Sequence, residues 1–361
     1  MTSLVRLPGL IDPHVHLRDP GATHKEDFLT GTRAAIAGGI TLVLDMPNNP
    51  GAPVISPGAL AAKEAAARGR IVSDVGLFYG ASAGNTGTYE QVADRVVGLK
   101  LYLDHTTGDL KVEELEAIRE IMLAWPRNKP LCVHAEDRTV AMVLGLVTSV
   151  GRGVHFCHVS EQVEIELIRE AKERGLPVTC EVAPHHLYLT EDDLPRLQGY
   201  GVMRPPLKRA SDRDALWANL DVIDMIATDH APHTIEEKRG EKPAFGVPGL
   251  ETSLPLMLTA VQQGKLSLDR LVEMMYSAPA RLFRLGTKPQ PETYIEVDLD
   301  HKWTIRTERL HSKCGWTPFE GMDVTGAVET VVLRGQKVVE NGEVKAEPGV
   351  GIVIAPSDLP Q

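Results

Sequence analysis

Short runs of apolar, mostly β-branched residues alternate along the chain with amphipathic stretches of helical period. This alternation is typical of parallel β-strands joined by helices. We predict eight strands, at residues 10–17, 39–46, 72–80, 96–103, 130–136, 153–160, 177–184 and 222–230. Eight such units predict a closed (β/α)8 barrel of the TIM type. The competing open, doubly wound sheet would call for a glycine-rich dinucleotide turn after an early strand, and the sequence has none there.

Helix signals fill the gaps between these runs. The stretch "PGALAAKEAAARG" (57–69) begins with a proline, and "SEQVEIELIREAKERG" (160–175) predicts a helix capped by Ser160 and ended by Gly175. After about residue 295 the pattern changes to residue-by-residue alternation, with an Asn-Gly pair at 341–342 that predicts an antiparallel hairpin. We therefore expect a barrel over residues 7–290 and a small β subdomain made of residues 1–6 and 291–361. The prolines of "TKPQPE" (287–292) mark a linker between the two.

Composition indicates which partners, redox state and cellular location to expect. The net charge is −11 and no basic run offsets it, which argues against nucleic acid or an anionic membrane as a partner. The four cysteines, at positions 132, 157, 180 and 314, form no CxxC pair, so we expect reduced thiols. Neither a signal peptide nor an apolar run of about 20 residues is recognisable, and we expect a cytoplasmic protein.

Two histidines interrupt the first predicted strand, "LIDPHVHL" (10–17). Because side chains alternate along a strand, His14 and His16 point the same way, toward the mouth of a barrel. On its own the pair is equally compatible with two hydrogen-bonded core histidines. Polar residues recur, however, near the ends of other predicted strands, at His134, His158 and Asp229. Imidazole and carboxylate ligands without a cysteine quartet favour an open, catalytic zinc site.

A lysine, Lys100, lies within the fourth predicted strand, "VVGLKLYL" (96–103). The usual explanation for such a residue is a buried stem whose ammonium group reaches solvent. Next to metal ions a buried lysine should instead lose its proton, and the neutral amine can add carbon dioxide. The resulting carbamate has two oxygens that can bridge two metal ions.

Together these features resemble the dihydroorotases of the amidohydrolase superfamily, over essentially the whole chain. The shared motifs are "HLRDPG" (16–21), "MPN" (46–48), "GLKLY" (98–102), the single histidines of strands five and six, and "DHAPH" (229–233). The resemblance implies two Zn²⁺ ions, bridged by N6-carboxylated Lys100 and a hydroxide and bound by His14, His16, Lys100, His134, His158 and Asp229. The stretches "CEVAPHHLYL" (180–189) and "VPGLETSLPLML" (247–258) are most similar to the dihydroorotase domain of the animal multifunctional pyrimidine-biosynthesis protein.

The activity implied is the reversible cyclisation of N-carbamoyl-L-aspartate to L-dihydroorotate, in the synthesis of UMP, with Asp229 as the catalytic acid and base. Dihydroorotate carries a ring carboxylate, and Arg18 lies on the right face to bind it. By resemblance the other substrate-binding residues are Asn48, Arg204, His233, Pro248 and Gly249. Taken singly, Asn48 could be a turn residue, Arg204 a surface charge and His233 a helix cap.

Two further stretches have both an ordinary and a functional interpretation. Residues 104–110, "DHTTGDL", read as a polar turn, whereas the resemblance implies a loop that closes over the substrate with Thr106 and Thr107. The animal form carries an aromatic residue where Thr107 aligns, so this loop looks bacterial. Strand alternation predicts that Cys157 points away from the face of His158, as an inert buried thiol. The sequence does not decide whether a third metal ion binds near Cys157 and Glu181.

Two other functions compete with a dihydroorotase. An allantoinase or hydantoinase would share the metal ligands and the barrel, but its substrate has no carboxylate for Arg18. A metal-free, inactive scaffold associated with aspartate transcarbamoylase would be free to lose ligands, yet all six positions are filled here. We therefore expect an enzyme with a small-molecule substrate. A homodimer is expected, and association with aspartate transcarbamoylase is possible.

Overall fold

The computed structural model describes residues 4–286 and 292–356. Eight strands form one parallel sheet in sequence order, and an isolated parallel bridge between Val15 and His230 joins its last segment to its first. The predicted barrel is confirmed, and each predicted strand is present. The strands are β2 (Leu10–Val15), β3 (Ile40–Asp45), β4 (Asp74–Gly80), β5 (Gly98–Tyr102), β6 (Leu131–His134), β7 (Val154–Phe156), β8 (Val178–Val182) and β9 (Met225–Ile226).

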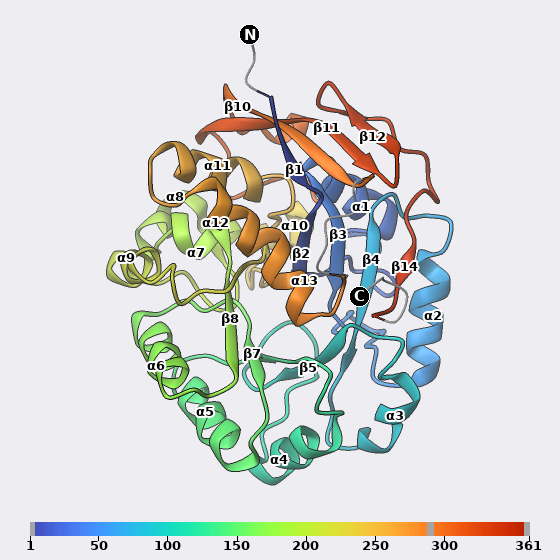
Figure 1. Ribbon diagram of the computed structural model, residues 1–361, viewed down its shortest axis with the longest axis vertical. Coiled ribbons are helices and arrows are strands. Elements are labelled where there is room, and N and C mark those ends of the chain that lie inside the picture. The colour runs from blue at the N-terminus through green and yellow to red at the C-terminus, as the bar shows by residue number, and fades with distance from the viewer. Residues whose placement is uncertain (1–3, 287–291, 357–361) are drawn as a thin grey trace.

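Helices surround these strands (Figure 1). The longer ones are α1 (Phe28–Ala37), α2 (Pro57–Ala67), α4 (Leu115–Ala124), α5 (Arg138–Val150), α6 (Gln162–Glu173), α9 (Ala210–Ala218) and α11 (Ser253–Gln262). Shorter helices are α3 (Tyr89–Val92), α7 (Pro184–Tyr188), α8 (Leu194–Leu197), α10 (Ile235–Arg239), α12 (Leu268–Val272) and α13 (Ala278–Leu282). The predicted proline start of α2 is confirmed, with Ser56 as its cap. The predicted serine cap of α6 is wrong. Its N-cap is Glu161, because the N–H and hydroxyl groups of Ser160 both bond to the carboxylate of Glu164 in the first turn.

The strands end earlier than predicted at the mouth of the barrel. Strands β2, β7 and β9 stop at Val15, Phe156 and Ile226. Just beyond each of them a non-glycine residue has a positive φ: 61° at Arg18, 35° at His158 and 47° at Asp229. A strand cannot continue through this left-handed backbone conformation. Arg18, His158 and Asp229 therefore lie on the short segments that follow the strands. By contrast, His14, Lys100 and His134 lie within strands β2, β5 and β6.

A separate antiparallel sheet lies at one end of the molecule (Figure 1). Its order is β1 (Leu4–Pro8), β10 (Tyr294–Thr304), β11 (Asp323–Leu333), β12 (Gln336–Glu340) and β13 (Glu343–Val344). The predicted turn between the last two has φ values of 52° at Asn341 and 73° at Gly342, which both fit a type I′ hairpin. This sheet, built from both ends of the chain, is the expected β appendage. Strand β14 (Val353–Ile354) pairs instead with β4 of the barrel, and the domain boundaries at 7 and 290 stay predictions. Most of the predicted linker, residues 287–291, lies outside the described residues.

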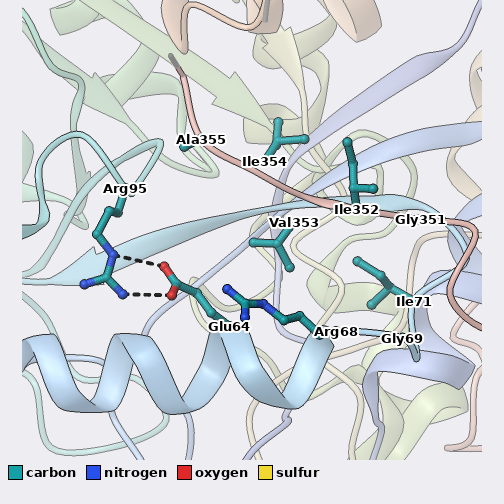
Figure 2. A pocket seen from close by; sticks show the side chains of 10 residues that line it. All are labelled: Glu64, Arg68, Gly69, Ile71, Arg95, Gly351, Ile352, Val353, Ile354 and Ala355. Carbon is teal, nitrogen blue, oxygen red and sulfur yellow. Dashed lines mark hydrogen bonds and ion pairs between the residues drawn. The ribbon is translucent and has the colours of Figure 1, made fainter. Parts of the chain in front are cut away.

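Away from the mouth, the barrel and its helices bury one extended apolar core. The four cysteines are free and buried. No helix in the described part of the chain is both long and apolar enough to cross a membrane. A hollow of about 510 Å³ lies between α2 and β14, where Glu64 pairs with Arg95 (Figure 2). None of the candidate site residues lines it.

Candidate metal centre and substrate pocket

The five histidine and aspartate side chains predicted as metal ligands come together at the mouth of the barrel. Asp229 Oδ1 lies 3.0 Å from His16 Nε2 and 3.3 Å from His14 Nε2. His134 Nδ1 lies 2.9 Å from His158 Nε2, and the His14 and His158 rings are 5.2 Å apart. All five are buried. The expectation that these five residues, from the ends of four different strands, share one centre thus agrees with the geometry.

Lys100 is fully buried and contacts an unexpected partner, with its Nζ 2.8 Å from Sγ of Cys157. Cys157 in turn clusters with His14 and Glu181, whose ligand atoms all lie within 4.8 Å of one another. Cys157 is a buried, free thiol as predicted, but it contacts one candidate metal ligand, Lys100, and clusters with another, His14. Strand alternation does not apply there, because β7 ends at Phe156 and His158 has a positive φ. The sequence analysis neither predicted nor excluded a third metal ion at this second cluster.

Opposite charges compensate one another within this buried cluster. Burial opposes ionisation of Asp229, but His14, His16 and His158 together hold its pKa well below the usual range. Burial and Lys100 oppose protonation of His14, yet the carboxylates of Glu181 and Asp229 raise its pKa to about 10. Burial also opposes ionisation of Cys157, but the Cys132 thiol and the Lys100 ammonium lower its pKa well below the usual value. The carboxylates therefore favour positive charge at the centre.

The donor set fits a metal ion. One oxygen or nitrogen atom from each of His14, His158 and Asp229 lies within 4.8 Å of the others, and all three side chains are buried. His158 Nδ1 is buried without a hydrogen-bond partner in the described structure, as expected for an atom that waits for a ligand. Nitrogen and carboxylate ligands at this density match zinc.

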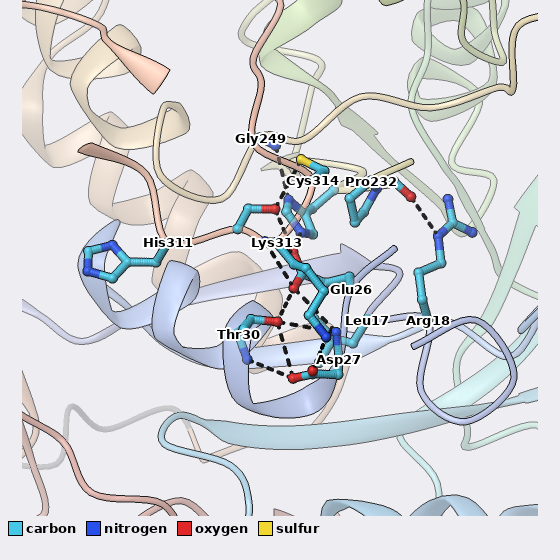
Figure 3. Close-up of polar contacts among 12 residues, drawn as sticks. Leu17, Arg18, Glu26, Asp27, Thr30, Pro232, Gly249, His311, Lys313 and Cys314 are labelled. Atoms are coloured by element: carbon cyan, nitrogen blue, oxygen red, sulfur yellow. Dashed lines mark hydrogen bonds and ion pairs between the residues drawn. The ribbon is translucent and has the colours of Figure 1, made fainter. Parts of the chain in front are cut away.

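A second, cationic region lies beside this centre and contains Arg18, Lys25 and Lys238. Arg18 Nε donates to the carbonyl oxygen of Pro232 at 3.2 Å (Figure 3), and its Nη2 lies 3.1 Å from His233 Nε2. Arg18 is 2% exposed, and among the described residues no carboxylate lies within ion-pair distance of it. His233 is buried beside Arg18, Lys25 and Lys238. Burial first, and then these cations, lower its pKa, so that His233 stays neutral.

The predicted loop and two further substrate residues border this region. Asn48 Nδ2 donates to the Thr107 carbonyl at 3.0 Å, and the Thr107 hydroxyl donates to the Phe245 carbonyl at 3.3 Å. The Arg204 guanidinium lies 4.9 Å from the centroid of the Phe245 ring. Two buried polar atoms, Asn48 Oδ1 and Arg204 Nε, have no partner in the described structure, so both are available to a ligand. Thr106 is half-buried beside Thr107.

Pro248 and Gly249 lie beside His230. Both line a small cavity with His230, and the Gly249 N–H donates to His230 Nδ1 at 3.2 Å. A Cβ on Gly249 would meet the Cβ of Thr228 at 3.0 Å, so the close approach of the two segments requires glycine. Their substrate contact stays a prediction.

One buried ion pair and several hydrogen bonds hold the segments that carry Arg18 and Asn48. Lys63 Nζ from α2 lies 2.8 Å from Asp45 Oδ2 and donates to the Met46 carbonyl at 2.7 Å, while Asp45 Oδ1 accepts the Leu17 N–H at 2.9 Å. On the other side, Glu26 accepts hydrogen bonds from Ser312 and Lys313 of the segment that follows β10 (Figure 3). The appendage therefore supports the substrate side of the barrel.

Sequence reasoning missed some of the residues that support the site and gave little weight to others. Asp12, which accepts the backbone N–H groups of His14 at 3.2 Å and of Thr228 at 3.1 Å, has the same strand parity as His14 and His16, and this signal could have identified it. Glu181 stands at the end of a predicted strand, as the other ligands do, and could have been weighed more heavily. Glu26 and Lys313 carry no periodic signal, because their contact joins segments 287 residues apart.

Comparison with known proteins decides the family. The sequence profile of the Amidohydrolase family matches residues 5–288. The chain belongs to the amidohydrolase family. This amidohydrolase is 39% identical over 361 residues to the dihydroorotase of Pyrococcus abyssi, which covers 95% of the chain and 85% of that protein. It is 49% identical over 352 residues to the multifunctional protein pyr1-3 of Dictyostelium discoideum, across 97% of the chain. The chain spans only 16% of that multifunctional protein. The predicted resemblance to dihydroorotases, and to the multifunctional pyrimidine proteins in particular, is confirmed.

Solved structures of amidohydrolases share the fold. The L-hydantoinase (dihydropyrimidinase) of Arthrobacter aurescens superposes with a TM-score of 0.92 at 29% identity, over 98% of this chain and 89% of that one. The inactive dihydroorotase-like domain of the CAD-like multifunctional protein of Chaetomium thermophilum gives 0.83 at 25% identity, over 98% and 99%. Both competing functions considered from the sequence are thus represented among the structural relatives. The side chains of the site must distinguish between them.

Proposed function

We propose that the chain is a dihydroorotase, which interconverts N-carbamoyl-L-aspartate and L-dihydroorotate. The observation that carries this proposal is Arg18, a buried guanidinium with no carboxylate partner among the described residues. An unpaired buried charge is costly, and a planar guanidinium matches a carboxylate in a bidentate manner. A ligand that brings its own carboxylate would remove this cost. A hydantoin ring without a carboxylate would leave it.

The proposed zinc ligands are His14, His16, Lys100, His134, His158 and Asp229, with Lys100 as the carboxylated bridge. Two zinc ions bound there would lower the pKa of a shared water toward about 7 and polarise the carbonyl under attack. The completeness of this set supports an active enzyme over an inactive scaffold. The position of Lys100 also supports the carbamate, because the side chain is completely buried beside residues that could hold a metal ion.

The remaining chemistry follows from the side chains of the chain itself. In hydrolysis water adds to a ring carbonyl carbon, and the bond from this carbon to the ring nitrogen breaks. Asp229 is ionised, and its carboxylate lies at the proposed centre, 3.0 Å from His16, where it would take a proton from the attacking water. It then delivers that proton to the departing nitrogen. In ring closure the same carboxyl group acts in the opposite order.

Arg18, Asn48, Arg204 and His233 would orient the substrate, and Thr106 and Thr107 would cover it. Closure of a small loop excludes water and holds the reacting groups in place. The contacts of Thr107 with Asn48 and Phe245 support this role. A homodimer, association with aspartate transcarbamoylase and a cytoplasmic location stay predictions from the resemblance.

The proposal is tested with purified, zinc-loaded protein. Metal analysis should give two zinc ions per chain, and a steady-state assay should detect both dihydroorotate hydrolysis and carbamoyl-aspartate cyclisation. A chain that binds two zinc ions and catalyses neither direction would contradict the proposal.

A further inference from the structure

The barrel closes between β2 and β9 largely through one side chain. The backbone contribution to this closure is the bridge between Val15 and His230, with the His16 N–H donating to the His230 carbonyl at 2.7 Å. Deeper in the barrel the Asp12 carboxylate takes the place of a strand ladder. Its Oδ1 accepts the N–H of Thr228 at 3.1 Å, and its Oδ2 accepts the Thr228 hydroxyl at 2.5 Å.

The Thr228 hydroxyl also contacts the residue that follows Asp229. Thr228 Oγ1 accepts the N–H of His230 at 3.0 Å while it donates to Asp12. The residues on both sides of Asp229 are therefore fixed by one hydroxyl group and one carboxylate. Between them Asp229 has a φ of 47°, a left-handed conformation that is unfavourable for a residue with a Cβ. Such a conformation persists only where its surroundings hold it.

The contacts of Asp12 are with the two segments that close the barrel. Asp12 is 1% exposed, and in the two described ranges no cation pairs with it. Its partners are the backbone N–H groups of His14, at 3.2 Å, and Thr228, together with the Thr228 hydroxyl. One carboxylate thus sets the relative position of the backbone at His14 and at Asp229, which face each other across the barrel closure.

We propose that Asp12 and Thr228 are positioning residues that hold Asp229 in the strained conformation from which its carboxylate serves as the proton carrier. The inference rests on the proposed dihydroorotase function and adds two residues to it. Loss of the Thr228 hydroxyl should let the Asp229 backbone relax, so that the carboxylate spends less time near the reacting atoms. Arg18 and the metal ligands other than Asp229 are not held by this hydroxyl. The turnover number should therefore fall while substrate affinity and zinc content change little.

Thr228→Val tests this with little change in side-chain volume. It removes a donor to Asp12 and an acceptor for His230 at once. We expect kcat to fall about 10- to 100-fold in both directions, as when a positioned group is misaligned, with KM within about twofold and two zinc ions retained. Thr228→Ser keeps the hydroxyl and should restore most of kcat. Thr41→Val is the matched control, since the buried Thr41 on β3 donates only to the Leu10 carbonyl, at 3.3 Å, remote from Asp229.

A second variant protects the test against a folding defect. Asp12→Asn keeps an oxygen for the two backbone N–H groups but turns an amide donor toward the Thr228 hydroxyl. It should lower kcat to a similar extent, with zinc retained. A crystal structure of either variant should show a changed φ at residue 229.

The outcomes distinguish a failure of the proposed dihydroorotase function from a failure of the positioning role alone. A wild-type chain that binds zinc and lacks dihydroorotase activity would overturn the proposed function, and this inference with it. An active wild type whose Thr228→Val and Asp12→Asn variants keep kcat would overturn the inference alone. So would variants in which zinc content, melting temperature and kcat fall together without rescue by serine, because that pattern indicates a merely structural role.

Discussion

Lys100 Nζ and Cys157 Sγ lie 2.8 Å apart, and Cys157 belongs to the candidate metal cluster that shares His14 with the cluster of His158 and Asp229. A lysine in this position can serve both clusters only in a form that does not repel cations. A carbamate on Lys100 has that property, because it replaces a positive group with a negative one that has two ligand oxygens. The contact thus locates the group on which the proposed binuclear centre depends.

Lys100→Ala should reduce bound zinc to one ion or none and abolish turnover. Without the bridge, two dications at close range repel each other. Zinc per chain, measured by mass spectrometry, and the rate of dihydroorotate hydrolysis check this, and added acetate or propionate should restore part of the rate. Lys238→Ala is a suitable control, since buried Lys238 donates only to backbone carbonyls and should affect stability but not zinc content. A Lys100→Ala protein with two zinc ions and normal activity would refute the carbamate.

Asp229→Asn should slow both directions about 10²- to 10⁴-fold, the usual contribution of a positioned general acid or base. Ring closure consumes a proton, so hydrolysis should rise with pH in the wild type while cyclisation falls over the same range. Rates in both directions from about pH 5 to 9, with zinc content measured for each protein, provide the test. Asp224→Asn, just before β9 at the opposite end of the strand, should leave the profiles unchanged. Parallel profiles for the two directions would argue against Asp229 as the proton carrier.

Replacing Thr106 and Thr107 together by alanine should lower kcat several-fold to about tenfold, the effect expected for one or two neutral hydrogen bonds. The reason is loss of the Thr107 hydroxyl contact with the Phe245 carbonyl, which holds the loop against the substrate region. Zinc content should not change. The half-buried Thr86, whose hydroxyl donates to Glu120 at 3.1 Å outside this loop, supplies a control substitution to alanine. Unchanged kinetics in the double variant would mean that the loop plays no part in turnover.

The buried His186 should make the metal-free protein sensitive to acid. Burial lowers its pKa to about 4 from an ordinary value near 6.5. The unfolded chain therefore binds a proton below about pH 6.5 that the folded chain does not, so stability present above that pH is lost as the pH falls toward 4. The loss from this group is about 3 kcal/mol.

Denaturant unfolding of the metal-free protein between about pH 4 and 7 measures this effect. The variant His186→Gln should show a shallower loss of stability with falling pH, because glutamine does not titrate. Its amide can still donate to the Pro205 carbonyl, as His186 Nε2 does at 3.2 Å. The exposed His24 provides a matched substitution that should leave the slope unchanged. Equal slopes for His186→Gln and wild type would show that His186 is already charged in the folded state.

Strand periodicity was sufficient to predict the barrel and the convergence of His14, His16, His134, His158 and Asp229. Each follows or ends a strand of a parallel barrel, and the carboxyl ends of such strands meet at one mouth. Periodicity failed where the backbone leaves the strand. The positive φ of His158 ends the alternation after Cys157, so the two neighbouring side chains do not point to opposite faces, and the contact of Cys157 with Lys100 lay beyond that rule. Contacts from the appendage, such as the Trp316 indole bond to the His233 carbonyl at 2.7 Å, also lay beyond sequence reasoning, because they join segments 83 residues apart.

The central claim is that Arg18 selects a substrate by its carboxylate, and one pair of substrates isolates this feature. Dihydroorotate and dihydrouracil have the same ring and differ in the carboxylate. For the zinc-loaded wild type we predict that kcat/KM is about 10⁴-fold higher for dihydroorotate, since the analogue leaves a buried polar group unpaired. Arg18→Lys should shrink this preference with zinc content unchanged, because an ammonium group cannot form the bidentate pair. Equal kcat/KM values for the two substrates, or a preference for dihydrouracil, would contradict the account and assign the chain to the hydantoinases.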